Sequence, residues 1–517
     1  MSLDVRHENT SIWMATEGCR PRPPLDGDVE ADVCIIGAGI AGLSTAYLLC
    51  RENRSVVLVD DGPIGGGQTA RTTAHLSNAV DDRYQHLERL HGPHAARLAA
   101  RSHTSAIDRI EQIAAEEAID CDFARLDGFL FAPPGESTDV LDRELEAARR
   151  AGLSDVEVVP RAPLDPFDTG KSLRFPRQGQ FHPLKYLAGL AAALERRGGR
   201  IFGNTHATNV QGGDRARIET GQGPVIKAGA VVVATNTPIN DLVAIHTKQA
   251  PYMTYAIGAR VPRGSVYRAL YWDTLDPYHY VRLQQDQEPA AFGDVEPADL
   301  LIVGGEDHKT GHADDAGERF ARLEAWARER FPTMQSVQYH WCGQVMEPVD
   351  GVAFIGRNPL DKDNVYIATG DSGMGMTHGT IAGILLTDLI VGRPNEWAGL
   401  YDPSRKSLRA AKQFLKENID VAGMYGRWLT AGDVATVDEI PPGSGAIVRR
   451  GWTKIAAFRD DHGALVELSA SCPHLGCVVA WNSADKTWDC PCHGSRFDGH
   501  GRVINGPANT PLKKKRG

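Results

Sequence analysis

Hydrophobic and polar positions near the start of the chain follow first a strand pattern, then a helix pattern, then a strand pattern again. From Ala31 an apolar run, VCIIG, leads into a glycine-rich turn and a helical pattern, IAGLSTAYLLCREN. A second apolar run, SVVLVD, ends at Asp60. Two buried strands joined by an amphipathic helix form a βαβ unit, in which the strands are parallel. We therefore expect a parallel sheet to begin here.

The same alternation continues through most of the chain. Amphipathic helix patterns such as KYLAGLAAALERRGG and ERFARLEAWARERF are interleaved with short strand patterns such as AVVVATN and NVYIATG. After about residue 425 the pattern changes to three short strands, GAIVRRG, KIAAFRD and ALVELSA, separated by Gly and Asp turns. The pattern predicts an α/β protein with a small all-β domain at its C-terminal end.

These changes of pattern divide the chain into four segments. A polar, proline-rich and irregular arm is expected over residues 1–28, and the main α/β unit over residues 29–400. A charged linker helix is expected over residues 401–425, and the all-β domain over residues 426–512. Several domains are expected in any case, because 517 residues exceed what one hydrophobic core usually serves.

Charge and apolar content exclude some classes of partner. The formal net charge of -10 argues against binding to nucleic acid or to an anionic membrane, because such surfaces select for Lys and Arg. No apolar run reaches the roughly 18 residues of a membrane span, and the N-terminal MSLDVRHENTSIW lacks the apolar core of a signal peptide. We expect a cytoplasmic protein without an integral membrane segment.

Four of the nine cysteines crowd into 21 residues near the C-terminal end, in the segments CPHLGC (472–477) and CPCHGS (490–495). Each segment also holds a histidine. Thiolates and neutral imidazoles on two loops can together hold an iron-sulfur cluster. A structural zinc site, or two disulfides in a small β domain, would use the same residue types.

The two loops and their flanks resemble the Rieske family. The resemblance rests also on Trp481, Asn482, Trp488, Asp489, Phe497 and the proline loop Gly506-Pro507-Ala508. It implies that Cys472 and Cys490 ligate one iron of a 2Fe-2S cluster, that His474 and His493 ligate the other, and that Cys477 and Cys492 form a disulfide. Ser495 can donate a hydrogen bond to a cluster sulfide, but Phe497 stands where relatives often carry tyrosine. With one donor fewer, we expect a potential below that of respiratory Rieske proteins.

The first glycine-rich turn has the spacing of a dinucleotide site. Gly37, Gly39 and Gly42 lie between the first strand and the first helix, and Asp60 ends the second strand 18 residues after the last glycine. Such glycines let the backbone approach a pyrophosphate at the helix N-terminus, and the acid accepts hydrogen bonds from ribose. An ordinary glycine-rich turn is the alternative. Both FAD and NAD use this spacing. We find one such unit, whereas a reductase carrying electrons from nicotinamide to flavin usually has two, and the choice between the two cofactors depends on the remaining motifs.

Two further segments, GGGQTARTTAHLS (65–77) and TGDSGMGMTHGTIAG (369–383), resemble FAD-binding signatures of the D-amino-acid oxidase and glycine oxidase-like superfamily. The resemblance implies a Rossmann-like FAD-binding domain and an antiparallel-sheet substrate domain. The FAD-binding parts are expected at about 29–105, 175–245 and 342–400, and the substrate parts at about 106–174 and 246–341. The implied FAD contacts are Thr69, Arg71 and Thr72 near the pyrophosphate or isoalloxazine, Ala207 near the adenine, and Gly370, Asp371, Gly375, Met376 and Thr377 at the ring. We expect non-covalent FAD, with His75 as the residue to check for covalent attachment.

The substrate side carries weaker signals. Candidate catalytic residues are His308, in the polar strand end LLIVGGEDHKTG, together with Tyr252 and Tyr278. Other candidates for the wall of the site are Tyr255, Tyr280, Arg282, Trp341 and Gln344. A buried tyrosine with a satisfied hydroxyl is commoner than a catalytic one, so each competes with a purely structural role.

A flavin that accepts electron pairs and a cluster that carries single electrons favour a dehydrogenase over an oxidase. The whole chain resembles a bacterial family of FAD-dependent oxidoreductases with C-terminal Rieske domains, related to glycine and D-amino-acid dehydrogenases. The leading hypothesis is oxidation of an amine or amino acid, with electrons leaving through the cluster to an acceptor protein or oxygenase. The alternatives are a reductase component fed by an external donor, and a redox sensor whose cofactors are not turned over.

Overall fold

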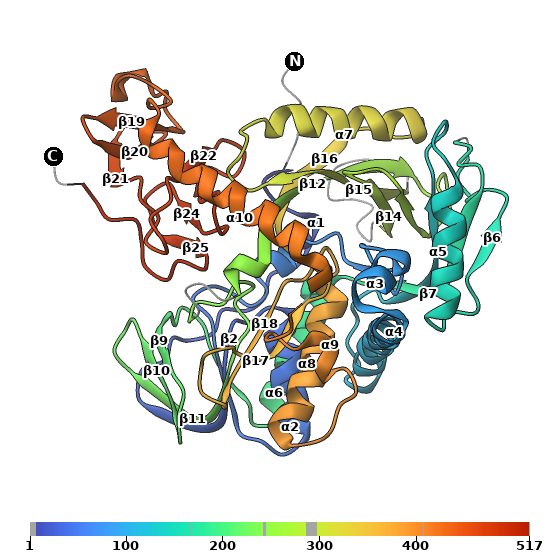
Figure 1. Cartoon of the computed structure of the whole chain (residues 1–517), viewed down its shortest axis with the longest axis horizontal. Helices are drawn as coiled ribbons and strands as arrows, with labels where there is room; N and C mark the ends of the chain where they lie inside the picture. The colour runs from blue at the N-terminus through green and yellow to red at the C-terminus, as the bar shows by residue number, and fades with distance from the viewer. Residues whose placement is uncertain (1–6, 166, 241–244, 286–296, 407, 516–517) are drawn as a thin grey trace.

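The computed structural model describes residues 7–165, 167–240, 245–285, 297–406 and 408–515. Two large sheets form the body of the molecule, and a smaller β domain lies against one side of it (Figure 1).

The first large sheet contains the predicted βαβ unit. Its parallel strands run in the order β18 (Val365–Thr369), β11 (Val225–Val233), β2 (Val29–Ile36), β3 (Val56–Val59) and β8 (Arg200–Phe202). The antiparallel strands are β17 (Phe354–Arg357) at one edge, and β10 (Ala216–Thr220) and β9 (Ala207–Gln211) beyond β11. Helices α2 (Ile40–Arg51), α6 (Pro183–Arg196) and α8 (Gly375–Val391) pack together beside this sheet. The core strands are apolar runs because both of their faces are buried.

The second large sheet is mostly antiparallel. Its strands run in the order β1 (His7–Glu8), β16 (Val337–Pro348), β12 (Gln249–Pro262), β15 (Ala298–Lys309), β14 (Tyr280–Gln285), β13 (Leu270–Asp273), β5 (Ala124–Phe131), β7 (Ser172–Gln180) and β4 (His75–Leu76), with β6 (Glu157–Val159) also pairing with β7. Helix α7 (Ala316–Arg330) packs on β12 and β15. Along β12, Tyr255 and Ile257 join the core under α7, whereas Thr254 and Ala256 line a cavity on the opposite face.

The remaining helices of the body are α3 (Tyr84–His91), α4 (Pro93–Glu116), α5 (Asp139–Arg150) and α9 (Ala398–Tyr401). None of the helices in the described ranges combines the length and the apolarity needed to cross a bilayer.

The N-terminal arm is more ordered than the expected irregular segment. It contains β1 and a short helix, α1 (Ile12–Thr16). Trp13 is fully buried, and its Nε1 donates a hydrogen bond of 2.6 Å to the carbonyl oxygen of Thr72. Ile12 and Trp13 are adjacent apolar residues within the polar arm, and their burial anchors the arm to the body.

The C-terminal domain contains two small antiparallel sheets. One consists of β19 (Ser444–Arg450), β20 (Thr453–Arg459) and β21 (Leu465–Ser469), and the other of β22 (Ala480–Asn482), β23 (Thr487–Asp489), β24 (Arg496–Asp498) and β25 (Val503–Asn505). Trp488 and Phe497 are fully buried in its core.

Helix α10 (Ala411–Tyr425) connects this domain to the body (Figure 1). On the body side, Lys309 forms a salt bridge of 2.7 Å with Glu417 of α10. The two parts also meet directly, because a Cβ atom added to Gly494 would lie only 2.6 Å from Pro251 Cβ. Gly494 has φ of +80°, so both its conformation and this close approach favour glycine.

Candidate functional site

A cavity of about 530 Å³ lies where the two large sheets and the C-terminal domain meet. Residues of all three parts line it, including Gly37 of the parallel sheet, Thr254 of the antiparallel sheet and Asn505 of the C-terminal domain. In open parallel sheets, ligands bind beyond the carboxyl ends of the strands, which is where the glycine-rich turn after β2 lies.

The glycine-rich turn is shaped to admit a phosphate group. Gly37 has φ of +107°, and a Cβ atom there would collide with the carbonyl of Ala234. Helix α2 begins at Ile40, and its N-cap residue Gly39 provides no side-chain hydrogen bond. The Ile40 N–H at the start of α2 donates to Thr69 Oγ1 at 3.2 Å, and the positive end of the helix dipole faces the same turn, where an anion can bind.

Asp60 helps to build this turn. Its carboxylate accepts hydrogen bonds from the backbone N–H of Ala38 at 2.6 Å and of Gly62 at 2.7 Å. Burial raises the pKa of Asp60 to about 6 in spite of these bonds. The side chain also lines the cavity, so it can both hold the turn and accept from a ribose hydroxyl.

Most of the predicted FAD contacts line this one cavity. The lining includes Gly37, Gly39, Asp60, Thr69, Arg71, Thr72, Ala207, Asp371, Gly375 and Met376, and also His75. Gly42, Gly370 and Thr377 are not part of the lining. Gly42 packs against the backbone of Gly37, and Thr377 Oγ1 lies 2.8 Å from His103 Nδ1, away from the cavity.

Two further features of the cavity bear on FAD. Helix α8 starts at Gly375 without a side-chain cap, so its first N–H groups are free to face a bound ring. Burial lowers the pKa of His75 to about 3, and its Nε2 lies 3.3 Å from the Val281 carbonyl oxygen. His75 is therefore a neutral imidazole in the cavity wall.

The two cysteine loops have the same backbone geometry. In the first loop, Cys472 N–H donates to the Cys477 carbonyl at 2.8 Å, and Gly476 N–H donates to the Cys472 carbonyl at 2.9 Å. In the second loop, Cys490 and Gly494 make the equivalent bonds, at 2.8 Å to the Ser495 carbonyl and at 3.0 Å to the Cys490 carbonyl. Each loop thus directs one cysteine and one histidine to the same side.

The four predicted cluster ligands face one another across the loops. The side chains of Cys472 and Cys490 are hydrogen-bond partners, and the ring centroids of His474 and His493 lie 5.0 Å apart. A disulfide joins Cys477 to Cys492. These two sulfurs are therefore occupied, which leaves two thiols and two imidazoles, a donor set that suits a 2Fe-2S cluster.

Ser495 and His246 lie beside the predicted cluster ligands. The hydroxyl of Ser495 bonds to the Cys472 thiol and accepts from the Ala508 N–H at 2.9 Å. The body of the protein covers one side of the loops, because the ring of His246 lies 4.9 Å from that of His474 and 6.1 Å from that of His493.

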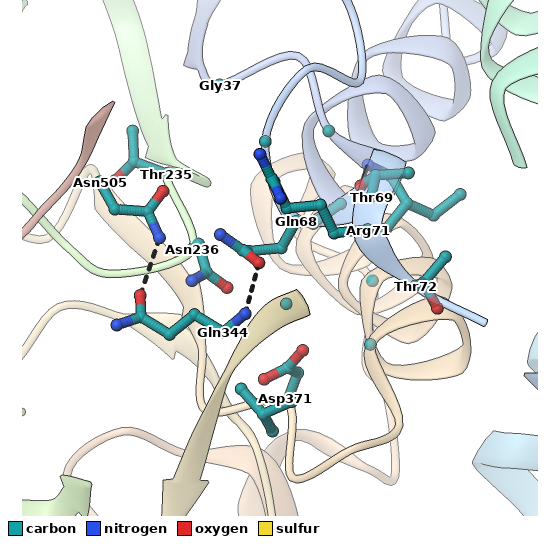
Figure 2. A pocket seen from close by; sticks show the side chains of 18 of the residues that line it. Gly37, Gln68, Thr69, Arg71, Thr72, Thr235, Asn236, Gln344, Asp371 and Asn505 are labelled. Atoms are coloured by element: carbon teal, nitrogen blue, oxygen red, sulfur yellow. Dashed lines mark hydrogen bonds between the residues drawn. The ribbon is translucent and has the colours of Figure 1, made fainter. Parts of the chain in front are cut away.

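Gln344 connects the cavity to the second cysteine loop. Its Nε2 donates to the carbonyl of Gly494, the residue after His493, at 2.9 Å. Its Oε1 accepts from Asn505 at 2.8 Å, and its backbone N–H donates to Gln68 Oε1 at 2.7 Å (Figure 2). The sequence predicts Gln344 as a wall residue, but its contact with the cluster loop depends on how the domains dock, which no motif indicates.

The predicted catalytic residues separate in the structure. Tyr278 lines the cavity, whereas His308 and Tyr252 do not. Side chains alternate along β15, so Asp307 faces the cavity while His308 stacks on Tyr255 at a ring distance of 5.8 Å. The segment was singled out for its polar residues, but the register of the strand directs Asp307 to the cavity.

Taken together, the fold and the two sites define a class of protein, a flavin-binding oxidoreductase that carries an iron-sulfur domain. The chain belongs to the FAD dependent oxidoreductase (DAO) family, which matches residues 32–389, and residues 430–516 match the Rieske [2Fe-2S] domain. These matches confirm the predicted family, the fold class and the two cofactors, FAD and a 2Fe-2S cluster.

Relatives match the chain over different lengths. YhfW of Bacillus subtilis (strain 168), named for a Rieske 2Fe-2S iron-sulfur protein, is 31% identical over 510 residues, which cover 98% of this chain and 97% of YhfW. Gamma-glutamylputrescine oxidoreductase of Escherichia coli (strain K12) is 27% identical over 402 residues, 74% of this chain and 90% of that protein. Glycine oxidase from Geobacillus kaustophilus has a similar structure, with a TM-score of 0.60 at 17% identity, over 73% of this chain and 99% of that one.

Proposed function

We propose that the protein is an FAD-dependent dehydrogenase that oxidises an amine or amino-acid-like small molecule and delivers the electrons one at a time to its own Rieske cluster. FAD would accept a hydride from the substrate, and the cluster would transfer electrons one at a time. Cys472 and Cys490 would ligate one iron, and His474 and His493 the other. The glycine-rich turn and the start of α8 would hold FAD without a covalent bond.

The observation that carries this proposal is the hydrogen-bonded bridge through Gln344. Gln344 lines the cavity that contains the FAD signatures. Its side-chain amide donates a hydrogen bond to the carbonyl of Gly494, the residue after His493. Asn505 belongs to the C-terminal domain, lines the cavity, and bonds to the same amide. A single chain therefore provides the contacts between both cofactor sites.

The substrate class is supported by the relatives and by the cavity. Gamma-glutamylputrescine oxidoreductase and glycine oxidase are named for an amine and for an amino acid. Tyr278, Tyr280 and Trp272 line the cavity wall formed by the antiparallel sheet, where they can orient a small molecule and exclude water.

Electrons would leave the cluster on its outer side. His474 is only half-buried, and the neighbouring Leu475 is 38% exposed, whereas His493 is buried. An acceptor protein or an oxygenase could approach the cluster at this loop.

Anaerobic stopped-flow mixing tests the function. The holoenzyme is mixed with a panel of amines and amino acids, or with NADH, while flavin and cluster absorbance are followed separately. We expect an amine or amino acid to reduce the flavin first and the cluster second. Fast reduction by NADH alone would instead establish a reductase component, and the absence of reduction by any of these donors would favour a redox sensor.

Gln344→Ala tests the bridge. The variant should reduce its flavin at the wild-type rate but slow the subsequent reduction of the cluster by about tenfold, because the contact between the two sites is lost. Gln338→Ala is the matched control, since Gln338 lies on the same strand but bonds to Ser336. If the cluster is reduced at the same rate in Gln344→Ala and in Gln338→Ala, Gln344 does not contribute to electron transfer between flavin and cluster.

A further inference from the structure

One end of the cavity, beside the turn that precedes α8, is lined by acidic side chains. Asp81, Asp307, Glu347 and Asp371 all belong to the lining. They come from separate parts of the chain, since Asp307 lies near the end of β15, Glu347 lies near the end of β16 and Asp371 precedes α8. The acidic end also contains the hydroxyl groups of Tyr278 and Tyr280.

Asp307 is half-buried, and one oxygen of its carboxylate lacks a partner. Its Oδ1 is inaccessible to solvent and has no hydrogen-bond partner among the described residues. Thr254 bonds to the same carboxylate, and Thr254 Oγ1 in turn lies 2.5 Å from the Tyr280 hydroxyl. Burial raises the pKa of Asp307 to about 6. A buried carboxylate oxygen without a partner is costly. The rest of the Asp307 side chain is only partly buried and lines the cavity, so a donor from a ligand can approach the carboxylate there.

Asp81 has a similar environment. Burial, followed by the nearby charge of Asp82, raises the pKa of Asp81 to about 8, and a hydrogen bond from Tyr278 only partly offsets this. The rings of Tyr278 and Tyr280 lie 5.3 Å apart at the same end of the cavity. Aromatic faces attract cations, so the two tyrosines and the carboxylates favour the same kind of ligand.

Among the described residues, positive groups act on this end only without direct contact: Arg83 on Asp81, and His279 and Arg319 on Asp307. Asp81, Asp307, Glu347 and Asp371 form no salt bridge there. Arg71 and Arg496 also line the cavity, but both face Asp485, with Arg71 Nη1 at 3.7 Å from its Oδ1. A carboxylate group on a ligand would therefore meet repulsion at the acidic end and no free partner there.

We infer that the acidic end binds the ammonium group of a substrate that carries no carboxylate, so that the substrate is a cationic amine rather than a zwitterionic amino acid. This inference rests on the proposed function, because it names the substrate class for the same cavity. The carboxylates of Asp81 and Asp307 and the rings of two tyrosines attract the ammonium group. Exclusion of water from this end of the cavity strengthens that attraction.

Three compounds of similar length separate cation from zwitterion and anion. Binding of n-butylamine, 4-aminobutanoate and butanoate to the oxidised holoenzyme is measured anaerobically by calorimetry and by the shift in flavin absorbance. We expect n-butylammonium to bind at least tenfold more tightly than 4-aminobutanoate, and butanoate not to bind. Equal or tighter binding of either carboxylate, or no binding of n-butylammonium at millimolar concentrations, would overturn the inference.

Two variants locate the binding. Asp307→Asn and Asp81→Asn keep the shape of the side chain but remove its charge, and each should weaken n-butylammonium binding about tenfold, the loss of one charged hydrogen bond. Glu318→Gln removes an equal charge from the exposed face of α7 and should leave the affinity unchanged. If all three variants bind like the wild type, the acidic end is not the site.

The binding measurement is independent of turnover, so the two proposals can fail separately. If n-butylammonium binds as expected but no amine reduces the flavin, the proposed dehydrogenase function fails and the cation site remains. If amino acids reduce the flavin and bind more tightly than n-butylammonium, the dehydrogenase function remains and the cation site is excluded.

Discussion

The cluster loops and the acidic end of the cavity both bury polar groups, but they satisfy them in different ways. In the loops, Cys472 and Cys490 face each other, Ser495 bonds to Cys472, and matching backbone hydrogen bonds close each loop. At the acidic end, Asp81 and Asp307 are half-buried in the cavity wall, with no counter-charge in a salt bridge among the described residues. The loops suit a resident group, whereas the inferred ammonium ligand would complete the acidic end only while it is bound.

This difference has an energetic basis. A buried charge without a partner is destabilising by several kcal/mol, which a carboxyl group avoids by keeping its proton. The raised pKa values of Asp81 and Asp307 mean that both carboxyl groups keep their protons to a higher pH than a carboxyl group in water. A bound cation would displace the protons of the two carboxyl groups. The positive charge of the ligand would then take the place of the protons.

The largest effect is expected from Cys490→Ser, which removes a ligand from the loops. The variant should lose its iron and acid-labile sulfide while keeping its flavin, because the FAD signatures lie in a separate domain. Iron and flavin analysis of the purified protein checks this. Cys50→Ser, at a buried cysteine of α2, should keep both groups, and loss of flavin together with iron in Cys490→Ser would contradict the independence of the two sites.

Cys477→Ser tests how firmly the loops are held. The disulfide spans 15 residues, for which the chain-entropy estimate is about 3 kcal/mol. Denaturant unfolding, followed by cluster absorbance, should show a loss of stability of about this size in the C-terminal domain. Cys19→Ser, at a free cysteine, provides the control. An unchanged unfolding midpoint in Cys477→Ser would mean that the loops do not depend on the covalent link.

The affinity of the acidic end for a cation should depend on pH, because protons and the cation compete for its carboxyl groups. At a pH of about 5 both carboxyl groups hold a proton, and above about 8 both are charged, whereas an alkylammonium stays charged throughout. The affinity for n-butylammonium should therefore rise about tenfold or more over this interval. The groups that influence the two carboxyls are Asp82, Arg83, Tyr278 and Asp307 around Asp81, and Thr254, Asp276, His279 and Arg319 around Asp307.

The same raised pKa values make the stability of the folded protein depend on pH. The folded protein holds protons on Asp81 and Asp307 at pH values where the unfolded chain has released them, so these groups lower stability as the pH rises from about 4 to 8. Thermal unfolding in that range should show a smaller decline for Asp81→Asn than for the wild type. An identical slope would argue against the raised pKa.

The smallest effect is expected from Phe497→Tyr. A hydroxyl that reaches a cluster sulfur would add one hydrogen bond, worth about 0.5–1.5 kcal/mol, or about 20–60 mV for a one-electron couple. The midpoint potential of the cluster should rise by this amount in a redox titration. A wild-type potential equal to that of respiratory Rieske proteins would contradict the expectation drawn from Phe497.

The cofactor-binding features could be predicted because their residues are contiguous. The turn around Gly37 and the loops around Cys472 and Cys490 use backbone conformations that short motifs specify. The acidic end could not be predicted in this way. Asp81, Asp307 and Glu347 are distant in sequence, and they meet only because two strands of one sheet end near the same turn.

Strand register and domain docking account for the remaining differences. The polar segment of β15 was visible in the sequence, but which of Asp307 and His308 faces the cavity depends on the pairing of β15 with β12. Gln344 was visible as a wall residue, but its bond to Gly494 depends on the docking of the C-terminal domain.

The central claim is that the flavin and the cluster of one chain exchange electrons, and flash photoreduction of the flavin tests it without a substrate. The flavin of the holoenzyme is reduced by a light pulse under anaerobic conditions, and cluster absorbance is followed at several protein concentrations. We predict a first-order cluster reduction whose rate is independent of concentration and lower in Gln344→Ala. A rate proportional to protein concentration, or no reduction of the cluster, would contradict the account.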